Sequence, residues 1–129
     1  MVSKYVVRDI MSRGIFEISL DTSISEAAKI MGDNNISSLV VSDDDGIYWG
    51  ILTSTDILKH YTENLDELKA KDIMVSKLIT VEPLAPLEKA AAIMAEHKIH
   101  HLYVLSELRE DKIIGVISSN DLIKALQNR

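Results

Sequence analysis

Two short stretches of the sequence place a hydroxyl residue three positions before an aspartate, directly after an apolar segment. If each stretch joins a strand to a helix, the hydroxyl, the backbone N–H groups and the positive end of the helix dipole would favour an anion there. The carboxylate could also accept two hydrogen bonds from a vicinal diol such as that of ribose. This pattern predicts a site for a ribose phosphate. Its residues are Thr53 and Asp56 in the first stretch, and Ser118 and Asp121 in the second.

The same spacing also suits an ordinary helix cap. A Ser or Thr followed three residues later by an acidic residue can satisfy the first amides of a helix, and such a cap contributes about 1 kcal/mol. The two interpretations are compatible, because a cap can be recruited when a ligand arrives. The residues alone leave the choice open.

Three histidines, His97, His100 and His101, lie close together in the second half of the chain. They could bind a metal, contact a phosphate or serve packing alone. We expect His97 to end a helix and the other two to begin a strand, where adjacent side chains face opposite ways, and this disfavours a shared metal. An imidazole becomes charged when an anion raises its pKa, so phosphate binding here should strengthen as the pH falls.

Patterns typical of enzymes are absent from the sequence. It contains no nucleophile–base pair, no Gly-rich phosphate loop and no cysteine. Asp56 and Asp121 could be taken for a pair of acid/base carboxylates. Each, however, stands three residues after a hydroxyl residue, as in a helix cap, and this explains both without catalysis. The acidic stretch at residues 43–46 lacks the ligand spacing and the distal Glu of a calcium loop, so we expect a solvated turn. We predict no catalytic residues, no metal site and no enzymatic activity.

The chain contains an internal duplication. A shift of 63 places lays Asp9-Ile10-Met11 on Asp72-Ile73-Met74. After a two-residue insertion, a shift of 65 lays Gly50 on Gly115 and continues through both aspartates of the hydroxyl stretches. Chance does not produce a colinear series of this length with one gap the size of a loop, so the repeat is an established feature of the sequence.

Each copy predicts the same order of elements, β-α-β-β-α. The helical periodicity of Ile24, Ala27, Ala28 and Met31 recurs at Leu87, Ala90, Ala91 and Met94. Short apolar runs predict strands at residues 15–18, 38–41 and 50–52 of the first copy, and at 78–81, 102–105 and 115–117 of the second. Each copy should end in a helix, at residues 54–61 and 119–126 respectively.

The fold class that follows is α/β (α+β), with the two repeats related by a pseudo-twofold axis. We place the repeats at residues 7–61 and 72–128, with a partly helical linker at 62–71. One copy is too short to bury its own apolar faces, so the two copies should form one compact module. Small Ala pairs on both first helices would allow close packing.

Composition narrows the class of protein. The 129 residues are 47% hydrophobic and 26% charged, which is typical of a globular chain. The net charge of −6 and the scarcity of aromatic residues make nucleic-acid binding improbable. No apolar run approaches the length of a membrane span, and no signal peptide is apparent, so we expect a cytoplasmic protein without membrane contact. Residues 1–64 carry −5 and residues 65–129 carry −1, so an anionic ligand suits the second half better.

The order of these motifs resembles a tandem pair of cystathionine β-synthase (CBS) domains, a Bateman module. The resemblance rests on the repeated Asp-Ile-Met, the helix with an Ala pair, the segment His100-His101-Leu102-Tyr103-Val104, and the closing Gly-apolar-apolar-[Ser/Thr]-x-x-Asp. It extends from about Val7 to Leu126. It implies that adenosine nucleotides bind in clefts between the repeats, with the Asp on the ribose and the preceding hydroxyl residue on ribose or phosphate.

By this resemblance each pocket combines residues of both repeats. The Asp56 pocket would combine Thr53, Thr55 and Asp56 with Ile79, Thr80 and Ile99. The Asp121 pocket would combine Ser118, Asn120 and Asp121 with Glu17, Ile18 and Ile36. Glu17 occupies the position of Thr80, and a carboxylate facing a phosphate would be unfavourable unless its side chain points outward. Related modules often place basic residues near the phosphate where His100 and His101 stand, whereas the first copy has Ser37 and Ser38 there.

The function expected from the resemblance is regulation by ligand binding. The module would sense AMP, ADP, ATP or S-adenosylmethionine as a ligand, without any cofactor. It would form a disc-like homodimer and act on an unidentified regulated protein. A protein–protein adaptor with vestigial nucleotide pockets is the alternative, and a small enzyme or nucleic-acid binder of another type is a third possibility.

Overall fold

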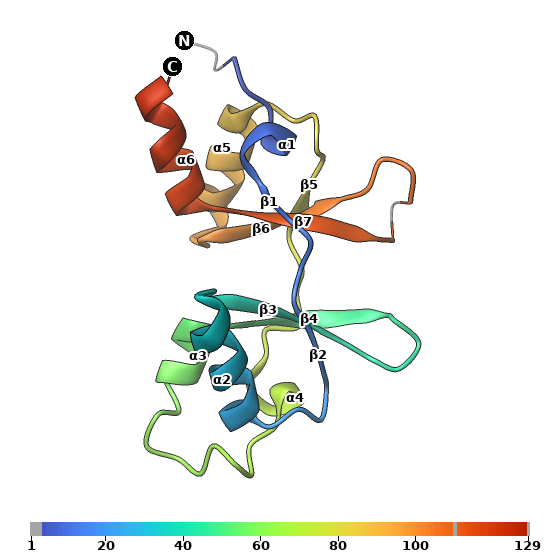
Figure 1. Ribbon diagram of the computed structural model, residues 1–129, viewed down its shortest axis with the longest axis vertical. Helices are drawn as coiled ribbons and strands as arrows, with labels where there is room; N and C mark the ends of the chain where they lie inside the picture. The colour runs from blue at the N-terminus through green and yellow to red at the C-terminus, as the bar shows by residue number, and fades with distance from the viewer. Residues whose placement is uncertain (1–3, 110, 129) are drawn as a thin grey trace. The chain divides into compact units, whose positions relative to one another are not determined.

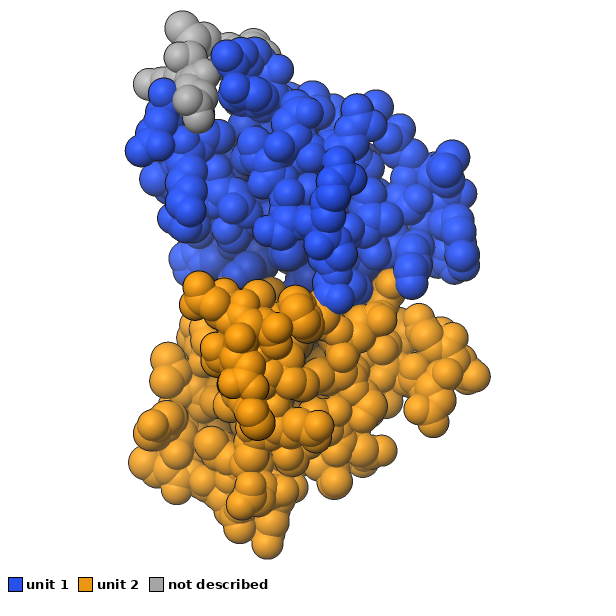
Figure 2. Space-filling view, viewed as in Figure 1, with its two compact units in different colours: residues 1–15, 79–129 blue, residues 16–78 orange. Residues whose placement is uncertain are grey.

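The computed structural model describes residues 4–109 and 111–128. The chain divides into two compact units (Figures 1 and 2). Unit 1 comprises residues 1–15 and 79–129, and unit 2 comprises residues 16–78. No helix in the described part of the chain is long and apolar enough to cross a bilayer.

Unit 2 is built on a three-stranded sheet. Its elements are β2 (Glu17–Ser19), α2 (Ile24–Asn34), β3 (Ser38–Ser42), β4 (Tyr48–Thr53), α3 (Ser54–Leu58) and α4 (Ala70–Ile73). The strands lie in the order β2-β3-β4, with β2 parallel and β4 antiparallel to β3. The buried face of α2 packs with Leu39, Val41 and Leu52 of the sheet, and this forms the core of the unit.

Unit 1 repeats this plan with a fourth strand. Its elements are α1 (Val7–Ile10), β1 (Ser12–Arg13), β5 (Thr80–Val81), α5 (Leu87–His97), β6 (His101–Leu105), β7 (Ile113–Ser118), α6 (Ser119–Ala125) and a 3₁₀ turn at Leu126–Asn128. The strand order is β1-β7-β6-β5. The predicted order β-α-β-β-α is confirmed in both copies.

The helical periodicity correctly locates α2 and α5. Ile24, Ala27 and Met31 are buried on α2, as are their counterparts on α5, Leu87, Ala90 and Met94. Ser23 caps the start of α2, because its side chain accepts a hydrogen bond from the Glu26 amide. The Ala pairs are less symmetrical than expected: Ala28 is half-buried and Ala91 is exposed.

Each unit contains a short segment that belongs in sequence to the other repeat. In unit 1 the segment is α1 with β1, and the amides of Val7 and Arg8 donate to the carbonyls of Ala85 and Pro83 at 2.9 and 2.7 Å. Val7 is fully buried in the core of this unit. Residues at the start of the first repeat therefore complete the core formed by the second.

Unit 2 contains the reciprocal segment, 63 residues further along. The amides of Ala70 and Lys71 donate to the carbonyls of Thr22 and Leu20 at 2.8 and 3.0 Å, and Ala70 is fully buried. The aspartates of the repeated Asp-Ile-Met cap these short helices. Asp9 accepts from the Val6 amide and Asp72 accepts from the Lys69 amide, each at 2.9 Å.

This reciprocal exchange distinguishes the compact units from the sequence repeats. The boundaries of the units fall between residues 15 and 16 and between 78 and 79. The repeat boundaries at residues 61–62 and 71–72 stay a prediction of the sequence. The linker prediction did anticipate some helix, and α4 begins at its last positions.

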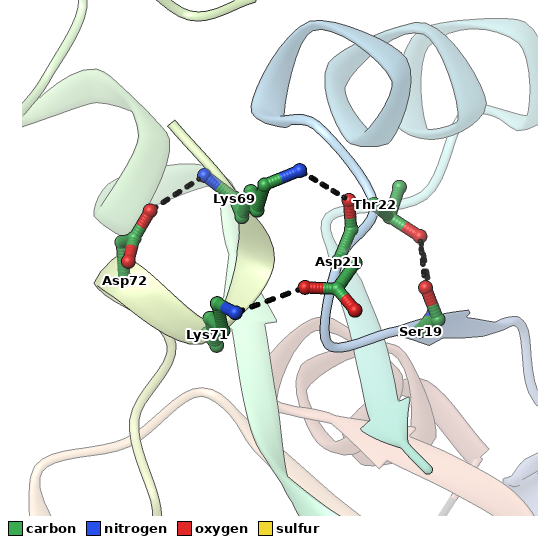
Figure 3. A network of polar contacts seen from close by, with 6 residues as sticks. All are labelled: Ser19, Asp21, Thr22, Lys69, Lys71 and Asp72. Carbon is green, nitrogen blue, oxygen red and sulfur yellow. Dashed lines mark hydrogen bonds and ion pairs between the residues drawn. The ribbon is translucent and has the colours of Figure 1, made fainter. Parts of the chain in front are cut away.

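A polar network attaches α4 to the loop between β2 and α2 in unit 2 (Figure 3). Lys71 Nζ lies 3.0 Å from Asp21 Oδ1. The hydrogen bond and the charge of Lys71 lower the pKa of Asp21, and the same contact raises the pKa of Lys71. In unit 1 the position of Asp21 is taken by Leu84, which is exposed. This ion pair is thus a feature of one copy only.

The acidic turn before β4 is organised by Asp43. Its Oδ1 accepts the amides of Asp45 and Ile47 at 2.9 and 3.0 Å, and its Oδ2 accepts the Trp49 indole at 2.8 Å. These bonds, that of Trp49 foremost, lower the pKa of Asp43. The Asp43 carboxylate, in the stretch predicted to be a solvated turn, therefore binds groups of its own hairpin.

Two glycines let the exchanged segments approach the sheets closely. A Cβ on Gly50 would lie 2.2 Å from the Val75 carbonyl oxygen, and one on Gly115 would lie 2.5 Å from that of Ser12. Val75 exchanges two backbone hydrogen bonds with Ile51, at 2.8 and 2.9 Å. Glycine is required at both positions because any side chain would separate the segment from the strand.

We expect Gly50→Ala to destabilise the chain by about 1–3 kcal/mol, because the new methyl group overlaps a backbone oxygen. Gly32→Ala is the matched control: a Cβ at this position of α2 meets nothing within 4 Å. It should leave stability unchanged or raise it by about 0.5–1 kcal/mol, since Ala favours helix over Gly. Urea unfolding followed by circular dichroism measures both. Equal stability of the two variants would contradict the close approach.

Candidate functional site

The junction between β4 and α3 carries the first hydroxyl stretch. The amide and Oγ1 of Thr53 both donate to Asp56 Oδ2 at 2.9 Å, while the Asp56 amide donates back to Thr53 Oγ1 at 3.3 Å. Both residues are half-buried. The capping interpretation is therefore confirmed here, and the cap holds the Asp56 carboxylate in one orientation.

The junction between β7 and α6 has the same geometry in unit 1. The Ser118 amide donates to Asp121 Oδ2 at 2.8 Å, and the Asp121 amide donates to Ser118 Oγ at 3.2 Å. Both side chains are again half-buried. At both junctions the cap bonds to the carboxylate through Oδ2, and Oδ1 is the other oxygen that an incoming hydroxyl could reach.

The expectation of free amides at the start of these helices is wrong for most of them. The Ser54 amide donates to the Ser37 carbonyl at 3.0 Å, and the Ser119 amide donates to the His100 carbonyl at 2.8 Å. The third amide of each helix is taken by the cap. With helices of only five and seven residues, the dipole and the amides contribute little to anion binding. Charged side chains must supply that attraction.

The neighbouring strand brings the second set of predicted residues to the junction of unit 1. His101 pairs with Ser118 in the register of β6 and β7. His101 is half-buried and His100 is exposed. Burial lowers the pKa of His101, the neighbouring His100 lowers it further, and the charge of Asp121 acts in the opposite direction. The structure thus places the His100–His101 pair beside the Asp121 motif.

Serines occupy the same place in unit 2. Ser38 pairs with Thr53 in the register of β3 and β4, and Ser37 accepts the Ser54 amide. The sequence comparison identified these serines as counterparts of the histidines. It did not show that each pair adjoins the motif of its own unit, because that depends on the strand register.

The remaining predicted residues lie near these junctions or in the cores. Thr55 and Asn120 are exposed on the first turns of α3 and α6. Ile18 is buried in the core of unit 2. Half-buried isoleucines pack against the core of their own unit, Ile36 in unit 2 and Ile79 and Ile99 in unit 1.

Glu17 and Thr80 occupy equivalent strand positions with different exposure. Glu17 is exposed and stands on the face of β2 opposite the buried Ile18, whereas Thr80 is half-buried. Pockets that combine residues of both repeats stay a prediction, as does the effect of Glu17 on one of them. Within residues 4–109 and 111–128, no group of three or more His, Cys, Asp or Glu side chains could hold a metal ion.

Comparison with known families identifies the architecture. The CBS domain model matches residues 7–63 and 70–128, which together include both junctions. The chain belongs to the CBS domain family. The sequence resemblance is thereby confirmed, together with the fold class that it implied.

Individual CBS relatives share the whole module. A CBS domain-containing protein of Dictyostelium discoideum is 30% identical over 135 residues, covering 95% of this chain and 92% of the relative. A homoserine O-acetyltransferase of Methanosalsum zhilinae is 36% identical over 127 residues, which are 98% of this chain but 25% of that enzyme. The chain thus spans about a quarter of the length of such enzymes.

A solved CBS domain pair gives the structural counterpart. It was crystallised with 5′-methylthioadenosine and S-adenosyl-L-methionine, and it is 29% identical to this chain with a TM-score of 0.83. The match covers 95% of this chain and 96% of that one.

We expect Thr53→Ala and Ser118→Ala each to lower the free energy of unfolding by about 1 kcal/mol, because each removes the side chain that caps a helix. Thr53→Ser and Ser118→Thr keep the hydroxyl and should stay close to the wild type. Denaturant unfolding measures all four variants. If the alanine and hydroxyl variants were equally stable, the caps would not contribute to the fold.

Proposed function

We propose that this CBS pair is a regulatory module that binds an adenosine-containing ligand, of the class of AMP, ADP, ATP or S-adenosylmethionine. The observation that carries the proposal is the CBS pair of similar structure, which binds two adenosyl ligands. In support, both hydroxyl–aspartate junctions of this chain hold an oriented, half-buried carboxylate.

The chemistry of the junction suits a ribose. The cap occupies Oδ2 of each aspartate and leaves Oδ1 as an acceptor for ribose hydroxyls. Because the cap already fixes the carboxylate, little side-chain entropy is lost when the ligand binds. The exposed Thr55 hydroxyl and Asn120 amide adjoin the same first turns and offer further polar contacts.

Binding would act by population shift. A ligand favours the conformer for which it has the higher affinity, and a partner protein would respond to that conformer. The protein–protein adaptor with vestigial pockets remains the competing function, and it requires no ligand at either junction.

We expect at least one of AMP, ADP, ATP, S-adenosylmethionine and 5′-methylthioadenosine to stabilise the chain in thermal unfolding, by about 2.7 kcal/mol at a hundredfold excess over Kd. Asp56→Asn and Asp121→Asn keep an oxygen for the cap but remove the carboxylate charge. Isothermal titration calorimetry should show that at least one of them weakens binding about tenfold or more.

The outcomes separate the two functions. A folded wild-type chain that none of the five ligands stabilises would favour the adaptor. Ligand binding that is unchanged in both Asn variants would exclude the ribose role assigned to the aspartates. Unliganded unfolding of the variants is the control for folding.

We further propose that the module forms a homodimer. Two apolar side chains are exposed at the end of the first repeat, Leu58 (64%) and Tyr61 (69%). Their counterparts 65 residues later, Ile123 (63%) and Leu126 (53%), are also apolar and exposed. Exposed apolar residues at matching positions of both repeats favour contact with another protein surface. A second molecule of the same chain is the simplest partner.

We expect the wild-type chain to sediment as a dimer and the Leu58→Glu/Ile123→Glu variant to sediment as a monomer, because charges would enter an apolar interface. Leu108→Glu is the matched control, since Leu108 is 95% exposed on a loop. Analytical ultracentrifugation across a range of concentrations measures the distribution. A wild-type monomer at every concentration, or an unaffected double variant, would contradict this interface.

A further inference from the structure

The turn at residues 43–49, between β3 and β4 of unit 2, presents the single tryptophan of the chain. The Trp49 side chain is 50% exposed, yet its indole N–H donates to Asp43 Oδ2 at 2.8 Å. The other oxygen of that carboxylate accepts two backbone amides of the same turn. The ring is therefore held by its own turn while much of it faces solvent, so little side-chain entropy would be lost on binding a partner.

A second apolar side chain is exposed at the same turn. Ile47 is 59% exposed, and its amide binds the same Asp43 carboxylate as the Trp49 indole. Figure 1 shows this turn at the end of the β3–β4 hairpin away from α3. Thr53 lies four residues further along β4, or about 13 Å in an extended strand. The exposed pair is thus separate from the hydroxyl–aspartate junction.

The corresponding hairpin of unit 1 folds without an exposed aromatic ring. Ser106 occupies the place of Asp43, and its side chain likewise accepts two amides of its own turn. The place of Trp49 is taken by Ile114, which is half-buried and packs against the core of unit 1. The fold of the hairpin therefore does not account for an exposed tryptophan. Exposed aromatic residues of this kind are typical of protein–protein contacts.

The charge around the turn restricts the chemistry of a partner. Unit 2 contains five Lys or Arg and twelve Asp or Glu residues, for a net charge of −7 with histidines counted as neutral. Asp44 and Asp45 are exposed in the turn itself. Two of the five cations pair with carboxylates outside the turn. Such a surface attracts cationic groups and repels nucleic acid and anionic lipid.

We infer that the turn at residues 43–49 is a docking surface for a basic, partly apolar segment of a partner protein. A Lys or Arg side chain of the partner stacks on the Trp49 ring and pairs with Asp44 or Asp45, and a neighbouring apolar side chain covers Ile47. The inference goes beyond ligand binding, because neither junction takes part in it. It applies to a regulatory module and to an adaptor alike.

The test titrates the full chain with an amphipathic peptide of leucine, lysine and arginine that has no aromatic residue. Because the chain has one tryptophan, selective excitation of that residue reports contact at the turn. We expect a saturable shift of the Trp49 emission to shorter wavelength, since the bound peptide excludes water from the ring. The same peptide with glutamate in place of every lysine and arginine should cause no shift.

Two charge variants separate a local site from a general attraction to an acidic unit. Asp44→Asn/Asp45→Asn should weaken peptide binding about tenfold or more, and it keeps the backbone amide that binds Asp43. Glu26→Gln/Glu67→Gln is the matched control. It removes the same number of charges from exposed positions of unit 2 outside the turn, and it should retain the wild-type affinity at physiological salt.

A further pair of variants tests the aromatic contact. Trp49→Ala should weaken peptide binding about tenfold or more in isothermal titration calorimetry. Leu108→Ala, which shortens a 95% exposed side chain on the hairpin of unit 1, should bind as the wild type does. Circular dichroism and thermal unfolding of each free variant are the control for folding.

Several results would overturn this docking surface. One is the lack of any change in Trp49 fluorescence with the basic peptide, and another is equal weakening by the Asn and Gln variants, which would show a response to net charge alone. If Trp49→Ala converts a wild-type dimer into a monomer in analytical ultracentrifugation, the turn binds a second copy and not a basic partner.

The proposed function fails or stands separately. Asp44→Asn/Asp45→Asn should bind adenosyl ligands with the affinity of the wild type, because the turn is distant from the junction. If no adenosyl ligand binds the folded chain but the basic peptide does, the proposed function is wrong and the docking surface stands. If a ligand binds and the peptide does not, the reverse holds.

Discussion

The close approach of two carbonyl oxygens to two glycines is the constraint on which the rest of the structure depends. The Val75 carbonyl, which lies outside the strands of the first repeat, approaches Gly50 of that repeat. The Ser12 carbonyl, which lies outside the strands of the second repeat, approaches Gly115 in the same way. In unit 1 the contact adds β1 to the sheet, and in unit 2 it forms a single bridge between Val75 and Ile51. Each contact brings a short helix, α1 or α4, against the adjoining core. Neither repeat can complete its core alone, because Val7 and Ala70 are contributed in exchange. This mutual dependence explains physically why the unit occurs twice.

The same strands carry the junctions, so the close approach also positions the candidate sites. Gly50 lies in β4, and that strand ends at Thr53 opposite Ser38. Gly115 lies in β7, which ends at Ser118 opposite His101. Because register is set by the pairing of whole strands, the first residue of β3 or β6 and the residue before it are held beside the cap. At these positions unit 2 has two serines and unit 1 has two histidines.

The sequence predicts the parts of this arrangement that repeat locally. Helical periodicity locates α2 and α5, and the Ser/Thr-x-x-Asp spacing locates both caps. It does not reveal α1 or β1, because elements of four and two residues have no measurable period. The exchange of segments is also hidden, since the pairing of Arg13 with Gly115 joins residues far apart in the chain. The prediction of free amides at the helix starts was wrong for a similar reason. The amides of Ser54 and Ser119 donate to the carbonyls of Ser37 and His100, which are distant in sequence from these helices.

The sequence could not separate capping from ligand binding, and in the proposed function the two would use different oxygens of the same carboxylate. The cap needs Oδ2 and fixes the side chain, and a fixed carboxylate is a better partner for a diol than a mobile one. The stability that a helix cap provides explains why both copies have a hydroxyl residue and an aspartate at the junction. It does not explain why histidines stand at positions 100 and 101. Ser37 and Ser38 fill the same places beside the same cap in the other unit. The cap geometry that the two junctions share therefore does not determine which side chains stand beside it.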